Sequence, residues 1–298
     1  MIDRQIWDIS VNNLYLSVFR GFFVIEAKST KKKISKTIDA VEAIIINGFG
    51  ITYSHNFLQK LCEVNIPLII CGKNFHPTGM LLSTSGHYKL TKRQALQISL
   101  SLPFKKKLWQ QIVKEKVKNQ KNLLDSIGIN SNRLRYLAGK VKSGDTENIE
   151  AQAARFYWKE LFGKEFKRDF AQKGVNSFLN YGYSLVRASL SRYIVASGLN
   201  PSFGIHHKNE KNPFCLVDDL IEPFRPIVDR KVYYIAKQEK DGKLSVQTKR
   251  ILREVLTEGK LNYQGKFTEF QVILQEFVYS FIDSLKNKGI NLHFPKWN

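Results

Sequence analysis

Residues 80–126 read MLLSTSGHYKLTKRQALQISLSLPFKKKLWQQIVKEKVKNQKNLLDS, and the periodicity of the apolar residues changes inside this stretch. Before it, short runs of β-branched and aromatic residues alternate with glycine and proline, a pattern that predicts strands. After it, apolar residues recur at intervals of three and four, which predicts helices. The polar residues between these two regimes, centred on Gly86, predict a linker at 86–91.

The two regimes predict two domains. Residues 1–85 should form a small β-rich N-terminal domain, and residues 92–298 should form a larger all-α C-terminal domain, which gives an α+β fold class with two separate cores. The expected strands are Leu14–Phe19, Phe22–Ala27, Ala43–Ile46, Leu68–Cys71 and Met80–Ser83, with one helix capped by Ser54 among them. The expected helices are 92–100, 104–126, 131–141, 147–162, 174–197, 215–238, 245–258 and 267–288.

The chain is strongly basic. Its 47 Lys and Arg residues against 26 Asp and Glu residues give a net charge of +21, which favours a polyanionic partner, either nucleic acid or an anionic membrane surface. No apolar run approaches the ~20 residues that a membrane-spanning helix needs, and the N-terminus lacks a secretory pattern, so we expect a cytoplasmic location. Three cysteines without Cys-x-x-Cys spacing support neither a disulfide framework nor a zinc knuckle.

The positive charge is densest between residues 104 and 142. Lys107, Lys114, Lys118 and Lys121 fall on one side of the predicted helix, an arrangement that suits a track of DNA phosphates. An ordinary solvated lysine face is the alternative interpretation. Even as a DNA track, these lysines would position the nucleic acid without reading its sequence.

The chain lacks the glycine-rich loops of nucleotide hydrolases and dinucleotide enzymes, and it lacks the His-Glu-x-x-His motif of zinc proteases. Its rare acidic and histidine residues are therefore the candidate metal ligands. Glu150 lies near the start of a helix, His206 and His207 lie in a loop rich in glycine, proline and asparagine, and Asp219 and Glu222 are spaced to share a helix face. Each group also has a plain explanation: a helix dipole, a solvated loop and helix capping, respectively.

Four segments together resemble the CRISPR-associated endonuclease/integrase that inserts new spacers into CRISPR arrays, particularly its type II branch. They are Glu150–Trp158, Asn176–Leu185, Gly204–His207 and Asp219–Pro226. The resemblance covers essentially the whole chain, although its motifs lie only in the helical half. It implies the same order of an N-terminal β domain and a C-terminal helical domain.

The resemblance also implies roles for individual residues. Glu150, His207 and Glu222 match the metal ligands of the family, and Asp219 matches a further acidic site residue found in some members. His207 is preferred to His206 because the histidine of the family stands three positions after the loop glycine. The implied DNA contacts are Arg155, Tyr181, Arg187 and Arg225, in addition to Lys107, Lys114 and Lys118 of the lysine track.

Two carboxylates and one imidazole, without a thiolate, suit Mg²⁺ or Mn²⁺. The resemblance implies a metal-dependent DNA endonuclease and integrase, in which a DNA 3′-hydroxyl attacks a phosphodiester of the CRISPR repeat. It further implies double-stranded prespacer and repeat DNA, a homodimer and a small second CRISPR adaptation protein as partners. The rivals are a non-enzymatic basic scaffold that binds nucleic acid and a metallohydrolase with a small substrate, for which the high positive charge gives no reason.

Overall fold

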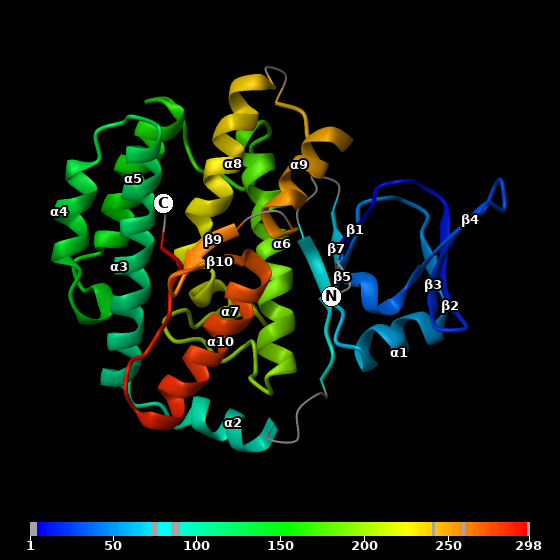
Figure 1. The fold of residues 1–298 in the computed structure, drawn as a ribbon, viewed down its shortest axis with the longest axis horizontal. Coiled ribbons are helices and arrows are strands. Elements are labelled where there is room, and N and C mark those ends of the chain that lie inside the picture. Colours follow the sequence, from blue (N-terminus) through cyan, green and yellow to red (C-terminus); the bar gives the residue numbers. More distant parts are fainter. Residues whose placement is uncertain (1–4, 73–76, 85–89, 240–241, 258–259, 297–298) are drawn as a thin grey trace.

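The computed structural model describes residues 5–72, 77–84, 90–239, 242–257 and 260–296, and it confirms the predicted α+β class. A part rich in strands is followed by a part made mostly of helices, and the two lie side by side (Figure 1). Within the predicted linker at 86–91, residues 86–89 lie outside the described residues. None of the described helices has the length and apolar character needed to cross a lipid bilayer.

Two four-stranded sheets form the N-terminal part. The first has the order β1-β5-β7-β8, in which only the pair β7-β8 is antiparallel. The second has the order β4-β3-β2-β6, in which only the pair β2-β6 is parallel. The bounds are β1 (Gln5–Ile9), β2 (Leu14–Phe19), β3 (Phe22–Ala27), β4 (Lys33–Thr37), β5 (Val41–Ile46), β6 (Thr52–Tyr53), β7 (Leu68–Cys71) and β8 (Pro77–Leu81), with the 3-10 turn η1 (Ile38–Ala40) and helix α1 (His55–Glu63) between them.

The predicted strands at 14–19, 22–27 and 68–71 have the bounds found in the structure. The turn between the first two is Arg20-Gly21, with φ of 46° and 81°, as a tight two-residue hairpin requires. Ser54 caps α1, since its hydroxyl accepts from the Phe57 N–H at 3.1 Å. Strand β4 was missed because its side chains are mostly polar and exposed, so it shows little of the apolar pattern on which the prediction relied.

Two clusters of buried side chains are present, but the boundary between them lies in the N-terminal sheet and not at the predicted linker. One cluster of buried side chains, including Leu16, Phe23, Ile44 and Phe57, fills the interior of the N-terminal part. Successive residues of a strand face opposite sides, so Ile45 points the other way from Ile44 and joins the helical core. The sheet of β5 and β7 is therefore buried on both faces and packs against the helical part.

Helices and one hairpin make up the part that follows the predicted linker. The elements are α2 (Leu90–Ile98), α3 (Leu102–Ser126), α4 (Asn132–Lys140), η2 (Ser143–Asp145), α5 (Ile149–Phe162), α6 (Val175–Ala196), α7 (Cys215–Leu220), η3 (Glu222–Phe224), α8 (Arg225–Gln238), α9 (Val246–Thr257), β9 (Lys260–Tyr263), β10 (Lys266–Glu269) and α10 (Phe270–Asn287). Helix α6 is central, because it packs against α8, α9, α10 and the strand β5 (Figure 1).

Two features of this part differ from the prediction. The helix expected over 215–238 is interrupted by η3, where Pro223 and Pro226 break the regular backbone. The part is also not entirely helical, because β9 and β10 form an antiparallel hairpin. Strand β9 lies between two expected helices, and β10 replaces the start of the helix expected over 267–288. Its turn residues, Gln264 and Gly265, have φ of 51° and 82° and match a tight hairpin turn.

Candidate active site

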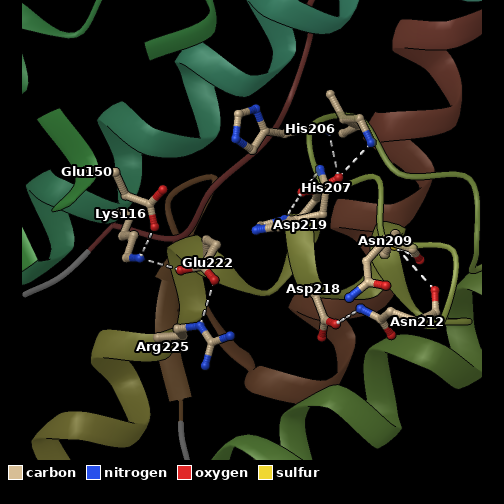
Figure 2. A network of polar contacts seen from close by, with 12 residues as sticks. Lys116, Glu150, His206, His207, Asn209, Asn212, Asp218, Asp219, Glu222 and Arg225 are labelled. Carbon is tan, nitrogen blue, oxygen red and sulfur yellow. Dashed lines mark hydrogen bonds and ion pairs between the residues drawn. The ribbon is translucent and has the colours of Figure 1, made fainter. Parts of the chain in front are cut away.

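The three predicted metal ligands come from separate elements that meet beside α3. Glu150 lies in the first turn of α5, Glu222 begins η3, and His207 lies in the loop between α6 and α7 (Figure 2). The alternative explanation of Glu150 was an acidic residue placed only to face the dipole at the start of a helix. It is weakened, because Asp145 already accepts from the N–H groups of Ile149 and Glu150 at 2.9 and 3.0 Å. The Glu150 carboxylate is thus available to turn toward Glu222.

A lysine that sequence reasoning did not select lies between the two carboxylates. The Nζ atom of Lys116, on α3, is 2.6 Å from Glu150 Oε1 and 2.5 Å from Glu222 Oε2. Its side chain is only 10% exposed. The signal that could have found it is its helical position: Ile112 and Gln120, one turn before and one turn after, are both buried, so Lys116 lies on the buried face of α3.

A second cation completes the cluster. Arg225 Nε donates to Glu222 Oε1 at 2.8 Å. Burial alone would raise the pKa of Glu222, but Arg225 and Lys116 outweigh it and lower the pKa to about 2. Burial likewise opposes the charge on Lys116, yet Glu222 and Glu150 raise its pKa. The cluster therefore holds two negative charges that balance two positive ones.

Asp219, the further acidic residue implied by the resemblance, contacts the loop that carries His207. It is fully buried and faces the loop, where its carboxylate accepts from the backbone N–H groups of Ile205, His206 and His207 at 2.6, 2.9 and 3.2 Å. The same carboxylate lies 2.5 Å from His207 Nδ1. Gly204 permits this closure, since a Cβ there would lie 2.4 Å from the His207 carbonyl oxygen.

The contact with Asp219 determines how His207 can act. A carboxylate only accepts hydrogen bonds, so in the neutral ring Nδ1 carries the proton and Nε2 keeps a free lone pair. The bond from Asp219 raises the pKa of His207 against the effect of burial, and the charges of Glu222 and Glu150 add to this. The ring of His206 lies next to that of His207, with centroids 5.4 Å apart, but it stacks on buried Trp109, with centroids 4.3 Å apart and planes 1° from parallel.

The donor set fits a hard divalent cation, although the ligands do not yet form a compact cage. Among the described residues, no three His, Cys, Asp or Glu side chains are close enough to hold a metal ion, and the Lys116 ammonium stands between two of the predicted ligands. Glu222 Oε2 is buried and finds no hydrogen-bond donor of suitable angle in the described part of the chain. Two carboxylates that converge on one cation, beside an imidazole, are ligands that Mg²⁺ and Mn²⁺ accept.

A pocket opens beside these residues. It has a volume of about 390 Å³, and its wall includes His207, Glu222, Arg225, Arg187 and Asp218. Arg187 is held by Asp218, to which Nε and Nη2 donate at 2.7 and 2.9 Å. Two of the arginines predicted to contact DNA therefore line the same pocket as His207 and Glu222, two of the three candidate ligands.

The remaining predicted DNA contacts are dispersed. Tyr181 is fully buried, so its predicted contact with DNA is wrong, because its position on the central helix α6 places its ring in the core. Arg155 is exposed on α5. In the lysine track, Lys107 and Lys118 are exposed and Lys114 is half-buried, so their phosphate contacts stay a prediction.

The comparisons with known proteins agree with one another. A family profile described as CRISPR associated protein Cas1 matches residues 9–258. The CRISPR-associated endonuclease Cas1 of Neisseria meningitidis serogroup C is 37% identical over 245 residues, which cover 82% of this chain and 77% of that protein. A casposase bound to integration product has a TM-score of 0.79 at 20% identity and covers 97% and 92% of the two chains. A Cas6-RT-Cas1--Cas2 complex has a TM-score of 0.78 at 18% identity and covers all of this chain and 37% of the other.

Proposed function

The chain belongs to the CRISPR-associated Cas1 family, and from this premise we propose that it is a metal-dependent DNA endonuclease and integrase that inserts spacer DNA into a CRISPR array. The observation that carries the proposal is that His207 and Glu222 line one pocket with Arg187 and Arg225, and that Lys116 joins Glu150 to Glu222 beside it. Side chains that only capped helices or faced solvent would have no reason to meet there.

The reaction is a transesterification. A 3′-hydroxyl of the incoming DNA forms a bond to a phosphorus of the repeat, the original P–O3′ bond breaks, and the departing strand keeps a new 3′-hydroxyl. One phosphodiester replaces another, so no ATP is required. The same site would perform endonucleolytic cleavage when water takes the place of the attacking hydroxyl.

Several side chains have defined tasks in this reaction. Glu150, Glu222 and the free Nε2 of His207 would hold the metal ion, with Asp219 orienting the imidazole. When bound, Mg²⁺ or Mn²⁺ would polarise the phosphoryl oxygen and stabilise the developing negative charge. Arg225 and Arg187, each fixed by a carboxylate partner, present guanidinium groups to the phosphate in the pocket.

The proposal includes partners. The net charge of +21 suits double-stranded prespacer and repeat DNA. Exposed apolar side chains on the N-terminal sheet, Phe19, Phe22 and Ile34, suit a homodimer or a contact with the small second adaptation protein. The casposase bound to integration product and the Cas1--Cas2 complex, whose fold this chain shares, support the choice of partners. A cytoplasmic location follows if the substrate is an array in cellular DNA.

The test is a joining assay with the purified chain, branched or nicked DNA, and Mg²⁺ or Mn²⁺ against EDTA. Glu150→Gln, His207→Ala and Glu222→Gln should each abolish joining while DNA binding persists, because each removes a ligand. Glu254→Gln is the matched control, since it removes a carboxylate that pairs with Lys231 outside the site. DNA binding without joining in either metal would favour the non-enzymatic scaffold. Loss of joining in His206→Ala but not in His207→Ala would reverse the assignment of the histidine.

A further inference from the structure

Lys116 is in an unusual place for a lysine of a DNA-binding protein. The lysines of the track point outward, whereas Lys116 is buried on the inner face of α3 and ends between two of the proposed metal ligands (Figure 2). The helix is held close to η3 here, because Asn119 Nδ2 donates to the Pro223 carbonyl oxygen at 2.8 Å. The backbone of α3 therefore keeps Lys116 within reach of both carboxylates.

The ammonium and a divalent ion need the same oxygens. Lys116 Nζ lies 2.6 and 2.5 Å from the nearest oxygens of Glu150 and Glu222, and a Mg²⁺ ion would lie at about 2.1 Å from each of its oxygen ligands. The carboxylates would have to close in by only about 0.5 Å to bind the ion where the nitrogen now lies. Lys116 thus marks the position of the ion within the cluster.

Charge prevents both cations from occupying this position together. Glu150 and Glu222 are balanced by Lys116 and Arg225, so the buried cluster is neutral. A divalent ion added beside the ammonium would put two positive centres within a few ångströms of each other, in surroundings that screen charge poorly. Withdrawal of the flexible lysine side chain removes this repulsion.

We propose that Lys116 is a tethered cation that competes with the divalent metal ion for Glu150 and Glu222 and must swing away when the ion binds. This inference rests on the proposed function, because it presumes the metal site. Lys116 is accordingly a positioning residue: it holds the two carboxylates together, and it lowers the affinity of the site for metal.

The displaced side chain has a place to go. A second pocket of about 170 Å³ is lined by Lys116 together with Gln120, Trp158, Arg168 and Arg225. Glu222 and Asp229 also line this pocket, so the withdrawn ammonium would still have carboxylates nearby.

The experiment is calorimetric titration of Mn²⁺ into the purified full chain and three variants. Lys116→Met keeps the length of the stem and removes the charge, and Lys116→Gln is a second variant that keeps a polar end, in case the first does not fold. Both should bind Mn²⁺ about tenfold more tightly than the unchanged chain, because no charge-assisted contact has to be broken first. Lys231→Met, which removes a lysine from its ion pair with Glu254, controls for the removal of one positive charge and should leave the affinity unchanged.

Thermal unfolding supplies the second readout. Without added Mn²⁺, the Lys116 variants should unfold at a lower temperature than the unchanged chain, because Glu150 loses its cation and Glu222 keeps only Arg225. Mn²⁺ should raise the unfolding midpoint of the variants by more than it raises that of the unchanged chain. An affinity that is unchanged or weaker in both Lys116 variants would overturn the competition while leaving the metal site intact. Absence of Mn²⁺ binding in every protein would overturn the metal site itself and the competition with it.

Discussion

Replacing Asp219 by asparagine should damage both the stability and the metal site, for reasons that can be separated. The carboxylate receives four donors: one oxygen accepts from the N–H groups of Ile205 and His206, and the other accepts from the N–H of His207 and from its ring Nδ1. An amide has one oxygen and one NH₂ group. In either orientation, its NH₂ group faces two donors and can accept from neither.

The structure sets the size of the effect. Two charge-assisted hydrogen bonds are removed in a fully buried place, at about 1.5–3 kcal/mol each, so Asp219→Asn should lower the free energy of unfolding by about 3–6 kcal/mol. This is a large part of the ~5–15 kcal/mol that stabilises a typical domain. Asp283→Asn is the matched control. Its carboxylate is 54% exposed in an ion pair with Lys286, and its replacement should cost about 1 kcal/mol or less.

The metal site responds through the tautomer of His207. An NH₂ group opposite Nδ1 would donate to it and shift the ring proton to Nε2, which removes the lone pair that would bind metal. Mn²⁺ affinity should then fall by about 10–100-fold, the usual reduction when the partner of a ligating histidine is removed. Urea unfolding followed by circular dichroism measures the stability, and calorimetry measures the affinity. An Asp219→Asn variant with a urea midpoint like that of Asp283→Asn and undiminished Mn²⁺ affinity would refute the role assigned to Asp219.

Two further predictions concern pH and salt. Burial raises the pKa of Asp229 to about 7 despite hydrogen bonds from Tyr183 and Tyr157. Its stabilising contribution should therefore be complete below about pH 4 and decline by up to about 1 kcal/mol per pH unit as the pH rises to about 7. The urea midpoint of the unchanged chain should decline from pH 4 to 8 relative to the midpoint of Asp229→Asn. If the midpoints of the two proteins changed with pH in parallel, the prediction would be contradicted. Neutralising three lysines of the track should flatten the plot of log K for duplex DNA binding against log[salt]. The magnitude of the slope should fall by about 0.9 for each phosphate that the protein no longer neutralises. An unchanged slope would indicate that these lysines form an ordinary solvated face. These three are Lys107, Lys114 and Lys118.

Much of the N-terminal part could be predicted because its signals are local. The strands at 14–19 and 22–27 and the turn Arg20-Gly21 follow from β-branched and aromatic runs around a glycine. The hairpin of β9 and β10 escaped prediction because each strand has only four residues, most of them polar. Its pairing depends on contacts across the turn, which the periodicity of either strand does not show.

The sequence alone determined which residues are candidates for the chemistry, and the tertiary structure decided what each of them faces. Residue type and spacing made Glu150, His206, His207, Asp219 and Glu222 candidates. The family resemblance then selected Glu150, His207 and Glu222 as the ligands. Spacing could not show that Asp219 turns toward backbone N–H groups, or that Lys116 turns inward among carboxylates that come from elements far apart in the sequence. The direction of a side chain depends on which elements pack around it, and for this site those elements are brought together only by the fold of the helical part.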